Sequence, residues 1–251
     1  MMTTPCPCSE ARIILKEQAI CSIASLEKRI VSCRLCPRLV RYREKIAWKK
    51  RASFQNWQYW GKPVPGFGDP RAGLLIVGLA PAAHGGNRTG RMFTGDGSAD
   101  FLIPALWRAG FANRPRSERR NDGLTLRGCF MTAVARCAPP GNKPLPRELA
   151  KCRKYLLDEL RLLRKIRAIL VLGRIAMDGF IDALKASGHP MKRLPFRHGG
   201  EYELPGFSAR LFASYHPSRQ NTQTGRLTAT MLDSVLRRTR KFLARRERTG
   251  K

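Results

Sequence analysis

LLIVGLAPAAHGGNRTGRMFTGD, residues 74–96, is the stretch of this 251-residue chain that indicates its fold most clearly. Its first five residues, Leu74–Gly78, form an uninterrupted apolar run, which is typical of a strand buried on both faces of a parallel sheet. The loop that follows is rich in glycine and alanine and ends in Phe93 and Asp96. It matches neither G-x-x-x-x-G-K-S/T nor G-x-G-x-x-G, the two common nucleotide-binding patterns. A generic phosphate-binding loop, a catalytic pocket and a simple turn all remain open from these residues.

Three further apolar runs have the same character, and each is followed by turn residues. They are Cys129–Ala135, Ala168–Gly173 and Arg210–Tyr215. Amphipathic helical patterns lie between and around these runs. They cover Phe101–Ala109, Pro146–Arg167, Arg174–Ala186 and Thr228–Arg246, with an N-terminal helix over about Ser9–Val31. Strands that alternate with helices predict an α/β/α sandwich in one domain, in which Arg114–Asp122 is expected to form a polar surface loop.

The charge of the chain predicts a polyanionic partner. Its 48 Lys and Arg residues face 18 Asp and Glu residues, which gives a formal net charge of +30. Because this excess is spread along the whole chain, it points to nucleic acid or an anionic membrane surface, with a solvated basic face as the alternative. The chain contains no run of about 18 apolar residues, so its sequence predicts no membrane span. The N-terminus does not resemble a secretory signal, so we expect a cytosolic protein with reduced thiols.

Four of the eight cysteines form a pattern typical of a metal centre. Cys33 and Cys36 belong to a C-x-x-C-P element, whose two thiolates can reach one centre. Cys137 follows the second strand and Cys152 lies near the start of the next helix, so both could complete a four-thiolate site. Thiolates favour zinc or an iron–sulfur cluster, and the spacing does not separate the two. Buried free thiols are the alternative, and this is the interpretation for Cys129; Cys6, Cys8 and Cys21 are left unassigned.

Chemically active side chains follow the predicted strands. In parallel α/β sheets, ligands bind beyond the carboxyl ends of the strands. The loops found there are APAAHGGNRTGRMFTGD, RCAPPGNKP, GRIAM and HPSRQNTQTGR. Their convergence on one edge would create a single site containing His84, Asp96, Asn142 and His216. Asp96 could instead cap the helix that begins near Ser98.

The C-x-x-C pair, the Gly-rich loop, RCAPPGNKP and HPSRQNTQTGR, which follow one another in this order along the chain, together resemble the uracil-DNA glycosylase superfamily. Within it they are most similar to family 5, the B-type iron–sulfur enzymes of bacteria and archaea. The resemblance implies a three-layer α/β/α sandwich around a four-stranded parallel sheet. The match begins near Val31, so residues 1–30 are predicted to be a helical extension and residues 31–251 a single domain.

The resemblance also implies an activity and a cofactor. A monomeric, cytoplasmic member would act on double-stranded DNA, and on single strands as a further form, that contain deaminated bases. It would flip out and excise uracil, with hypoxanthine and xanthine as further candidates, and leave an abasic site for base excision repair. Cys33, Cys36, Cys137 and Cys152 would hold a structural four-iron four-sulfur cluster, which the resemblance favours over zinc.

The same resemblance assigns roles within the pocket. Phe93 would stack on the flipped base, and His216 would donate a hydrogen bond to O2 of the departing uracil anion. The pocket wall would consist of Ala80, Pro81, Ala82, Ala83, His84 and Gly85, although His84 could contact DNA instead. The segment 78–82 has neither acid nor amide where many superfamily members carry a catalytic one, which resembles the B type. Asp96 is therefore the expected residue to orient the attacking water, with Asn142 as the second candidate.

The polar segment after His216 suits contacts with the sugar-phosphate backbone. Its candidate DNA-binding residues are Ser218, Arg219, Gln220, Asn221, Thr224 and Arg226. It offers no bulky aliphatic side chain to enter the duplex, so Arg219, Gln220 or another loop would have to do so. The alternative function is a non-catalytic nucleic-acid-binding module with a structural zinc or iron–sulfur site.

Overall fold

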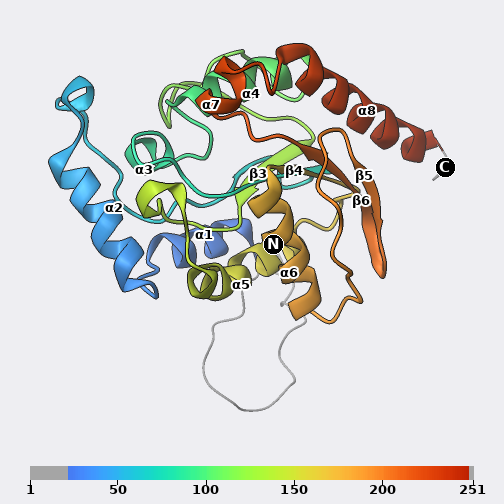
Figure 1. The fold of residues 1–251 in the computed structure, drawn as a ribbon, viewed down its shortest axis with the longest axis horizontal. Coiled ribbons are helices and arrows are strands. Elements are labelled where there is room, and N and C mark those ends of the chain that lie inside the picture. Colours follow the sequence, from blue (N-terminus) through green and yellow to red (C-terminus); the bar gives the residue numbers. More distant parts are fainter. Residues whose placement is uncertain (1–21, 249–251) are drawn as a thin grey trace, which may run out of the picture.

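The computed structural model describes residues 22–248, which fold around a six-stranded sheet in the order β1-β3-β2-β4-β6-β5 (Figure 1). The four inner strands are the predicted ones: β2 Leu74–Gly78, β3 Cys129–Ala133, β4 Ala168–Leu172 and β6 Phe207–Ser214. Each pairs in parallel with its neighbour, for example Ile76 with Met131 on one side and with Leu170 on the other. The predicted four-stranded parallel sheet is confirmed.

Two short antiparallel strands extend this sheet and were not predicted. They are β1 Phe67–Gly68, which pairs with β3, and β5 Glu201–Leu204, which pairs with β6. Neither has an apolar run, since β1 has only two residues and β5 contains the exposed Glu201 and Glu203. Edge strands of this kind leave little hydrophobic pattern to recognise.

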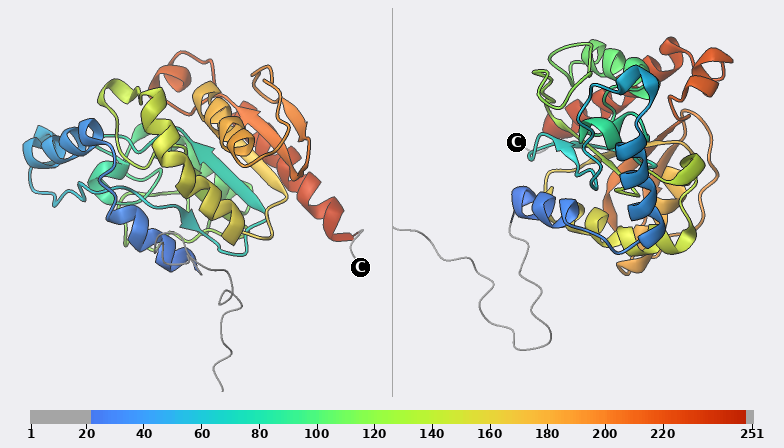
Figure 2. Two further views of the ribbon diagram at one scale, coloured as in Figure 1. Left: turned by 90° about the horizontal axis from the view of Figure 1, so that it is seen from below. Right: turned by 90° about the vertical axis from the view of Figure 1, so that its left-hand side faces the viewer.

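Helices cover both faces of the sheet, as the two views of Figure 2 show. The longer helices are α1 Ile23–Val31, α2 Pro37–Lys49, α4 Gly97–Arg108, α5 Pro146–Leu162, α6 Arg174–Ala186 and α8 Ala229–Arg248. The short ones are α3 Gly86–Thr89 and α7 Arg219–Gln223, with 3-10 turns η1 Ala52–Phe54 and η2 Pro140–Asn142. The predicted helices are therefore present, whereas α2, α3 and α7 were not expected. The part of the expected N-terminal helix before residue 22, like Cys6, Cys8 and Cys21, lies outside the described residues.

Alternate residues of the inner strands supply two separate cores. Leu74 and Ile76 pack with α4 and α8 on one face. Leu75 and Val77 pack with α5 and α6 on the other. All these side chains are fully buried, so each contributes about 1.5–3 kcal/mol of hydrophobic stabilisation. The result is the predicted three-layer sandwich, whose rigid sheet fixes the positions of the loops at its carboxyl edge.

No helix within residues 22–248 has both the length and the apolar character required to cross a bilayer.

Candidate active site

A cavity of about 800 Å³ lies at the carboxyl edge of the sheet. Its walls come from the loops after β2, β3 and β6 and from the first turn of α6. The predicted residues that line it are Ala80, Pro81, Ala82, Ala83, His84, Gly85, Phe93, Asp96, Asn142, His216, Ser218, Arg219 and Gln220. The structure thus brings together side chains up to 140 residues apart in the sequence, since parallel strands direct their following loops to one edge.

Asp96 uses its two carboxylate oxygens differently. Oδ1 caps α4 by accepting hydrogen bonds from the backbone N–H groups of Ser98 at 2.9 Å and Ala99 at 3.0 Å. Oδ2 lies against the Cα of Gly85, where any side chain would collide with it. Burial raises the pKa of this carboxyl, although the two capping N–H groups and Arg88 oppose that rise. The capping role is therefore shown, and the second oxygen is left on the cavity side.

Phe93 forms one face of the cavity in an unusual backbone conformation. Its φ of 47° lies in the left-handed region that few residues other than glycine adopt. The ring packs directly on the Cα of Gly78, where a Cβ would lie 2.8 Å from Phe93 Cζ. The centroid of the ring is 6.5 Å from that of His216, with a 35° angle between the planes. These two rings border the space in which a flat group can bind.

His216 is a neutral imidazole at physiological pH. It lies two residues after the end of β6, and burial lowers its pKa to about 4. A neutral imidazole carries one N–H donor and one acceptor nitrogen. The Nδ2 group of Asn221 donates to the His216 carbonyl at 2.8 Å, which holds the backbone of this loop in place.

Asn142 lies at the exposed rim of the cavity at the end of η2. Its φ is 56° and that of Gly141 is 59°, so two consecutive residues adopt the left-handed conformation. This turn brings the Asn142 amide to the opening rather than to the floor of the cavity.

Arg88 connects the two ends of the loop between β2 and α4, residues 79–96, which we call the pocket loop. This role of Arg88 was not predicted from the sequence. Its guanidinium donates to the carbonyl of His84 and to that of Gly95, both at 2.8 Å. The Cζ atom lies 3.9 Å from the centroid of each of two rings, Phe54 and Trp57, which enclose it. Residues 49–70 are rich in aromatic side chains, which could have indicated a packing role. Nothing in the sequence, however, indicated that two of these rings contact this arginine.

The α2–η1 region completes the wall of the cavity. Its contributors are Tyr42, Arg51 and Phe54, none of which was predicted. The hydroxyl of the neighbouring Tyr59 lies 3.0 Å from Nδ1 of His84. Burial, with Arg51 and Arg88 nearby, lowers the pKa of His84. His84 therefore lies in the wall of the cavity.

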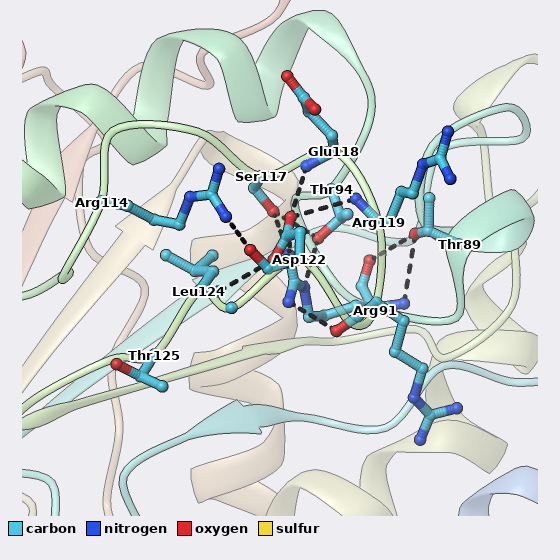
Figure 3. A network of polar contacts seen from close by, with 12 residues as sticks. Thr89, Arg91, Thr94, Arg114, Ser117, Glu118, Arg119, Asp122, Leu124 and Thr125 are labelled. Atoms are coloured by element: carbon cyan, nitrogen blue, oxygen red, sulfur yellow. Dashed lines mark hydrogen bonds and ion pairs between the residues drawn. The ribbon is translucent and has the colours of Figure 1, made fainter.

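A second arginine anchors the pocket loop to residues 114–122 (Figure 3). Arg91 donates from Nη2 to both carboxylate oxygens of Asp122 at 2.8 and 2.7 Å, and from Nε to Thr94 at 2.9 Å. Asp122 also accepts three backbone N–H groups. Burial raises its pKa, but Arg91 and these donors outweigh burial and lower the pKa to about 2. The prediction of a polar surface loop is wrong for its inner part, because Ser117 and Asp122 are buried against Arg91.

The predicted DNA-binding residues occupy two places. Ser218 caps α7 at the cavity mouth, and the Arg219 side chain packs against Gly97, where a Cβ would lie 2.6 Å from its Nε. Gln220 is exposed at the same mouth. The other three are set apart. Asn221 and Arg226 line a smaller cavity of about 300 Å³ that also contains His216, whereas Thr224 donates to the Gln220 carbonyl at 2.7 Å.

The four predicted metal ligands, Cys33, Cys36, Cys137 and Cys152, line one small cavity between α2, α5 and the loop after β3. The buried Arg43 donates from Nη1 to Cys137 Sγ at 3.1 Å. Burial raises the pKa of the Cys137 thiol to about 11 and that of Cys152 to about 12. In the described part of the chain, no group of three or more His, Cys, Asp or Glu side chains is arranged to hold a single metal ion. Cys129 is a separate core residue in β3, as predicted.

Comparison with known proteins gives the family. Residues 65–240 match the model of the uracil DNA glycosylase superfamily. A type-5 uracil-DNA glycosylase of Thermus thermophilus is 53% identical over 209 residues, which are 82% of this chain and 92% of that protein. The type-5 protein of Mycobacterium tuberculosis is 52% identical over 222 residues, 88% and 82% of the two chains.

Members of the neighbouring group are more distant. The type-4 uracil-DNA glycosylase of Pyrobaculum aerophilum is 32% identical over 164 residues, 64% of this chain and 74% of that protein. The type-5 protein of the same organism is 46% identical over 210 residues, 84% and 88% of the two chains. The predicted membership is confirmed: the chain belongs to the uracil DNA glycosylase superfamily, and within it to the type-5 group.

Proposed function

We propose that this chain is a DNA glycosylase that excises uracil by hydrolysing the bond between the base and its sugar. The observation that carries the proposal is the cavity that collects Phe93, Asp96 and His216 at one sheet edge. The names of the type-5 relatives support the same reaction, and the net charge of +30 suits a polyanionic substrate. The product is an abasic site, the starting point of base excision repair.

Binding of the base would use the apolar parts of the cavity. The ring of Phe93 would stack on the flipped uracil, while Ala80–Gly85 would enclose its edge. Small side chains there let the backbone approach a flat ring closely. The cavity of about 800 Å³ also has room for a two-ring base, so we extend the proposal to hypoxanthine and xanthine.

Departure of the base would depend on His216. Uracil leaves as an anion, so a donor aimed at O2 stabilises the transition state more than the ground state. The neutral imidazole has one N–H available for this hydrogen bond. Because the ring is already neutral, this donor needs no change of protonation near pH 7.

Attack on the sugar would depend on Asp96. Its Oδ1 is held by the cap of α4, which fixes the orientation of Oδ2 on the cavity side. Oδ2 would accept a hydrogen bond from the attacking water and place it beside the sugar carbon. Asn142, at the rim, would be a second contact for this water.

We further propose that the four cysteines hold a four-iron four-sulfur cluster. An all-sulfur donor set around one cavity is the arrangement such clusters use. The cluster would supply a structural connection between α2, α5 and β3, because hydrolysis of a glycosidic bond transfers no electrons. Arg43, which donates to Cys137, would offset part of the negative charge of the thiolates.

The proposed substrate is DNA in duplex form, with single strands accepted as well, and the acting form is a cytoplasmic monomer. The test is base release from a duplex with one uracil, read as strand cleavage after alkali treatment, beside the same duplex with thymine. We expect cleavage only at the uracil position. Salt-sensitive binding of both duplexes without any product would instead identify a non-catalytic DNA-binding module.

A further inference from the structure

Extraction of a base from a duplex leaves a gap in the stack. Proteins that open base steps frequently insert an apolar side chain such as Phe, Leu or Ile between them. The segment 218–221 offers only polar side chains, and part of the exposed Arg219 side chain packs against Gly97. An apolar side chain that enters the duplex would therefore come from another element.

Ile175 has the required exposure and position. It is 47% exposed, although large apolar side chains are normally buried in a core. It is the second residue of α6, which directly follows β4 at the carboxyl edge of the sheet. The other large exposed apolar side chains within residues 22–248 lie outside the catalytic cavity: Leu35, Trp48 and Trp107.

Ile175 also separates two cavities. It lines the cavity of about 800 Å³ that holds Asp96 and the cavity of about 300 Å³ on the other side of His216. The second cavity is lined by Phe196, Tyr215 and two arginines, Arg174 and Arg226, whose charges suit DNA phosphates. With a nucleotide extruded into the larger cavity and phosphates at the smaller one, a side chain on this partition would lie between that nucleotide and its neighbour in the duplex.

The backbone that carries Ile175 is held in place by buried neighbours. The next two residues of α6, Ala176 and Met177, are buried, and Met177 packs in the core against the sheet. Gly173, with a φ of 97°, makes the turn from β4 into the helix. A side chain on such a fixed backbone can enter between two bases with little further loss of conformational freedom on binding.

We propose that Ile175 is the side chain that enters the base stack when the target nucleotide occupies the catalytic cavity. The inference rests on the proposed excision of uracil from duplex DNA. It assigns the opening of the duplex to α6 and leaves the segment after β6 to stabilise the leaving base and to contact phosphates. Only a paired substrate needs the wedge, because in a single strand the target base has no partner to lose.

The test compares Ile175→Ala and Ile175→Leu with Trp107→Ala, which removes an apolar side chain of similar exposure, 48%, outside the cavity. Single-turnover uracil release is measured on a duplex and on the same strand alone. We expect Ile175→Ala to lower the duplex rate about tenfold or more and the single-strand rate by less than about threefold. Ile175→Leu should stay within about threefold of the unaltered chain on both substrates. Equal losses on the two substrates, or no loss on the duplex, would overturn the proposal.

A second measurement separates this inference from the proposed activity. The duplex carries 2-aminopurine beside 2′-fluoro-deoxyuridine, whose glycosidic bond resists cleavage. Binding of the unaltered chain and of Trp107→Ala should raise the 2-aminopurine fluorescence as the stack opens, whereas Ile175→Ala should bind with little rise. An equal rise with Ile175→Ala would reject the wedge. Failure of the unaltered chain to release uracil would instead reject the activity.

Discussion

Asp96 can serve both its observed structural role and its proposed chemical role, because each role uses a different carboxylate oxygen. Oδ1 accepts both hydrogen bonds of the α4 cap, and Oδ2 is directed towards Gly85 and the cavity. The sequence predicted both roles, because an acid two residues before a helical pattern is typical of a cap. It could not predict how the two oxygens are shared, since that depends on the missing side chain of Gly85 across the loop.

His216 makes stability depend on pH in a direction that can be measured. Its pKa is about 4 in the folded chain against an ordinary value of 6.5, so between these values the unfolded chain binds more protons. The free energy of unfolding therefore rises with pH in this window and falls on acidification, by about 2 kcal/mol from pH 7 to pH 5 for this residue.

The measurement is urea unfolding of the unaltered chain and of His216→Gln at pH 7 and pH 5. The unaltered chain should lose more stability on acidification than the variant. His84 and His198 also have lowered pKa values, but both are present in the two proteins. Their contributions to the pH dependence of stability therefore cancel in the comparison. Equal losses in the two proteins would show that His216 is not held neutral by the fold.

At the scale of elements, the pocket loop is held by arginines rather than by regular structure. Arg88 spans the loop from His84 to Gly95. Arg91 ties the same loop to Asp122, as Figure 3 shows. Both guanidiniums are buried, although arginine is rarely fully buried without a partner. The sequence predicted the loop and its end at Asp96, but it could not pair residues 91 and 122, because ion pairs between loops leave no periodic pattern.

Asp122→Ala should destabilise the chain strongly, because it leaves the Arg91 guanidinium buried without its carboxylate. The pair is 4% and 8% exposed, and removal of one partner of such a pair costs about 3–5 kcal/mol. The matched control is Asp233→Ala, which removes the partner of Arg108 in a pair that is 42% and 28% exposed. That change should cost less than about 1 kcal/mol. Chemical denaturation measures both, and a similar cost for the two variants would contradict the anchoring role.

At the scale of the whole molecule, the sheet was predictable and its surroundings were less so. The runs that begin at Leu74, Cys129, Ala168 and Arg210 are buried on both faces, so their composition alone indicates parallel strands. The convergence of the loops on one edge follows from that topology. The contributions of α2 and η1 to the cavity could not be predicted, because they depend on how a long connector folds back over the site.

The four cysteines come from parts of the chain that are more than a hundred residues apart, and the proposed cluster would connect these parts. Loss of one ligand should weaken that connection. Cys152→Ser should lower the iron content and the visible absorption of the purified protein. It should also lower the unfolding temperature, because the cavity would lose one of its four ligands. The control is Cys129→Ser, a buried thiol in β3 away from that cavity, which should retain the absorption. Unchanged iron content in Cys152→Ser would contradict the proposed ligand set.

The central claim, that Asp96 drives excision of uracil from DNA, is tested most directly by single-turnover uracil release from a duplex by the unaltered chain and by Asp96→Asn. The asparagine keeps an oxygen for the cap but removes the charge that orients water. We predict that the rate falls by about a hundredfold or more while duplex affinity changes by less than about threefold. Equal rates for the two proteins, or no uracil release by the unaltered chain, would contradict the account.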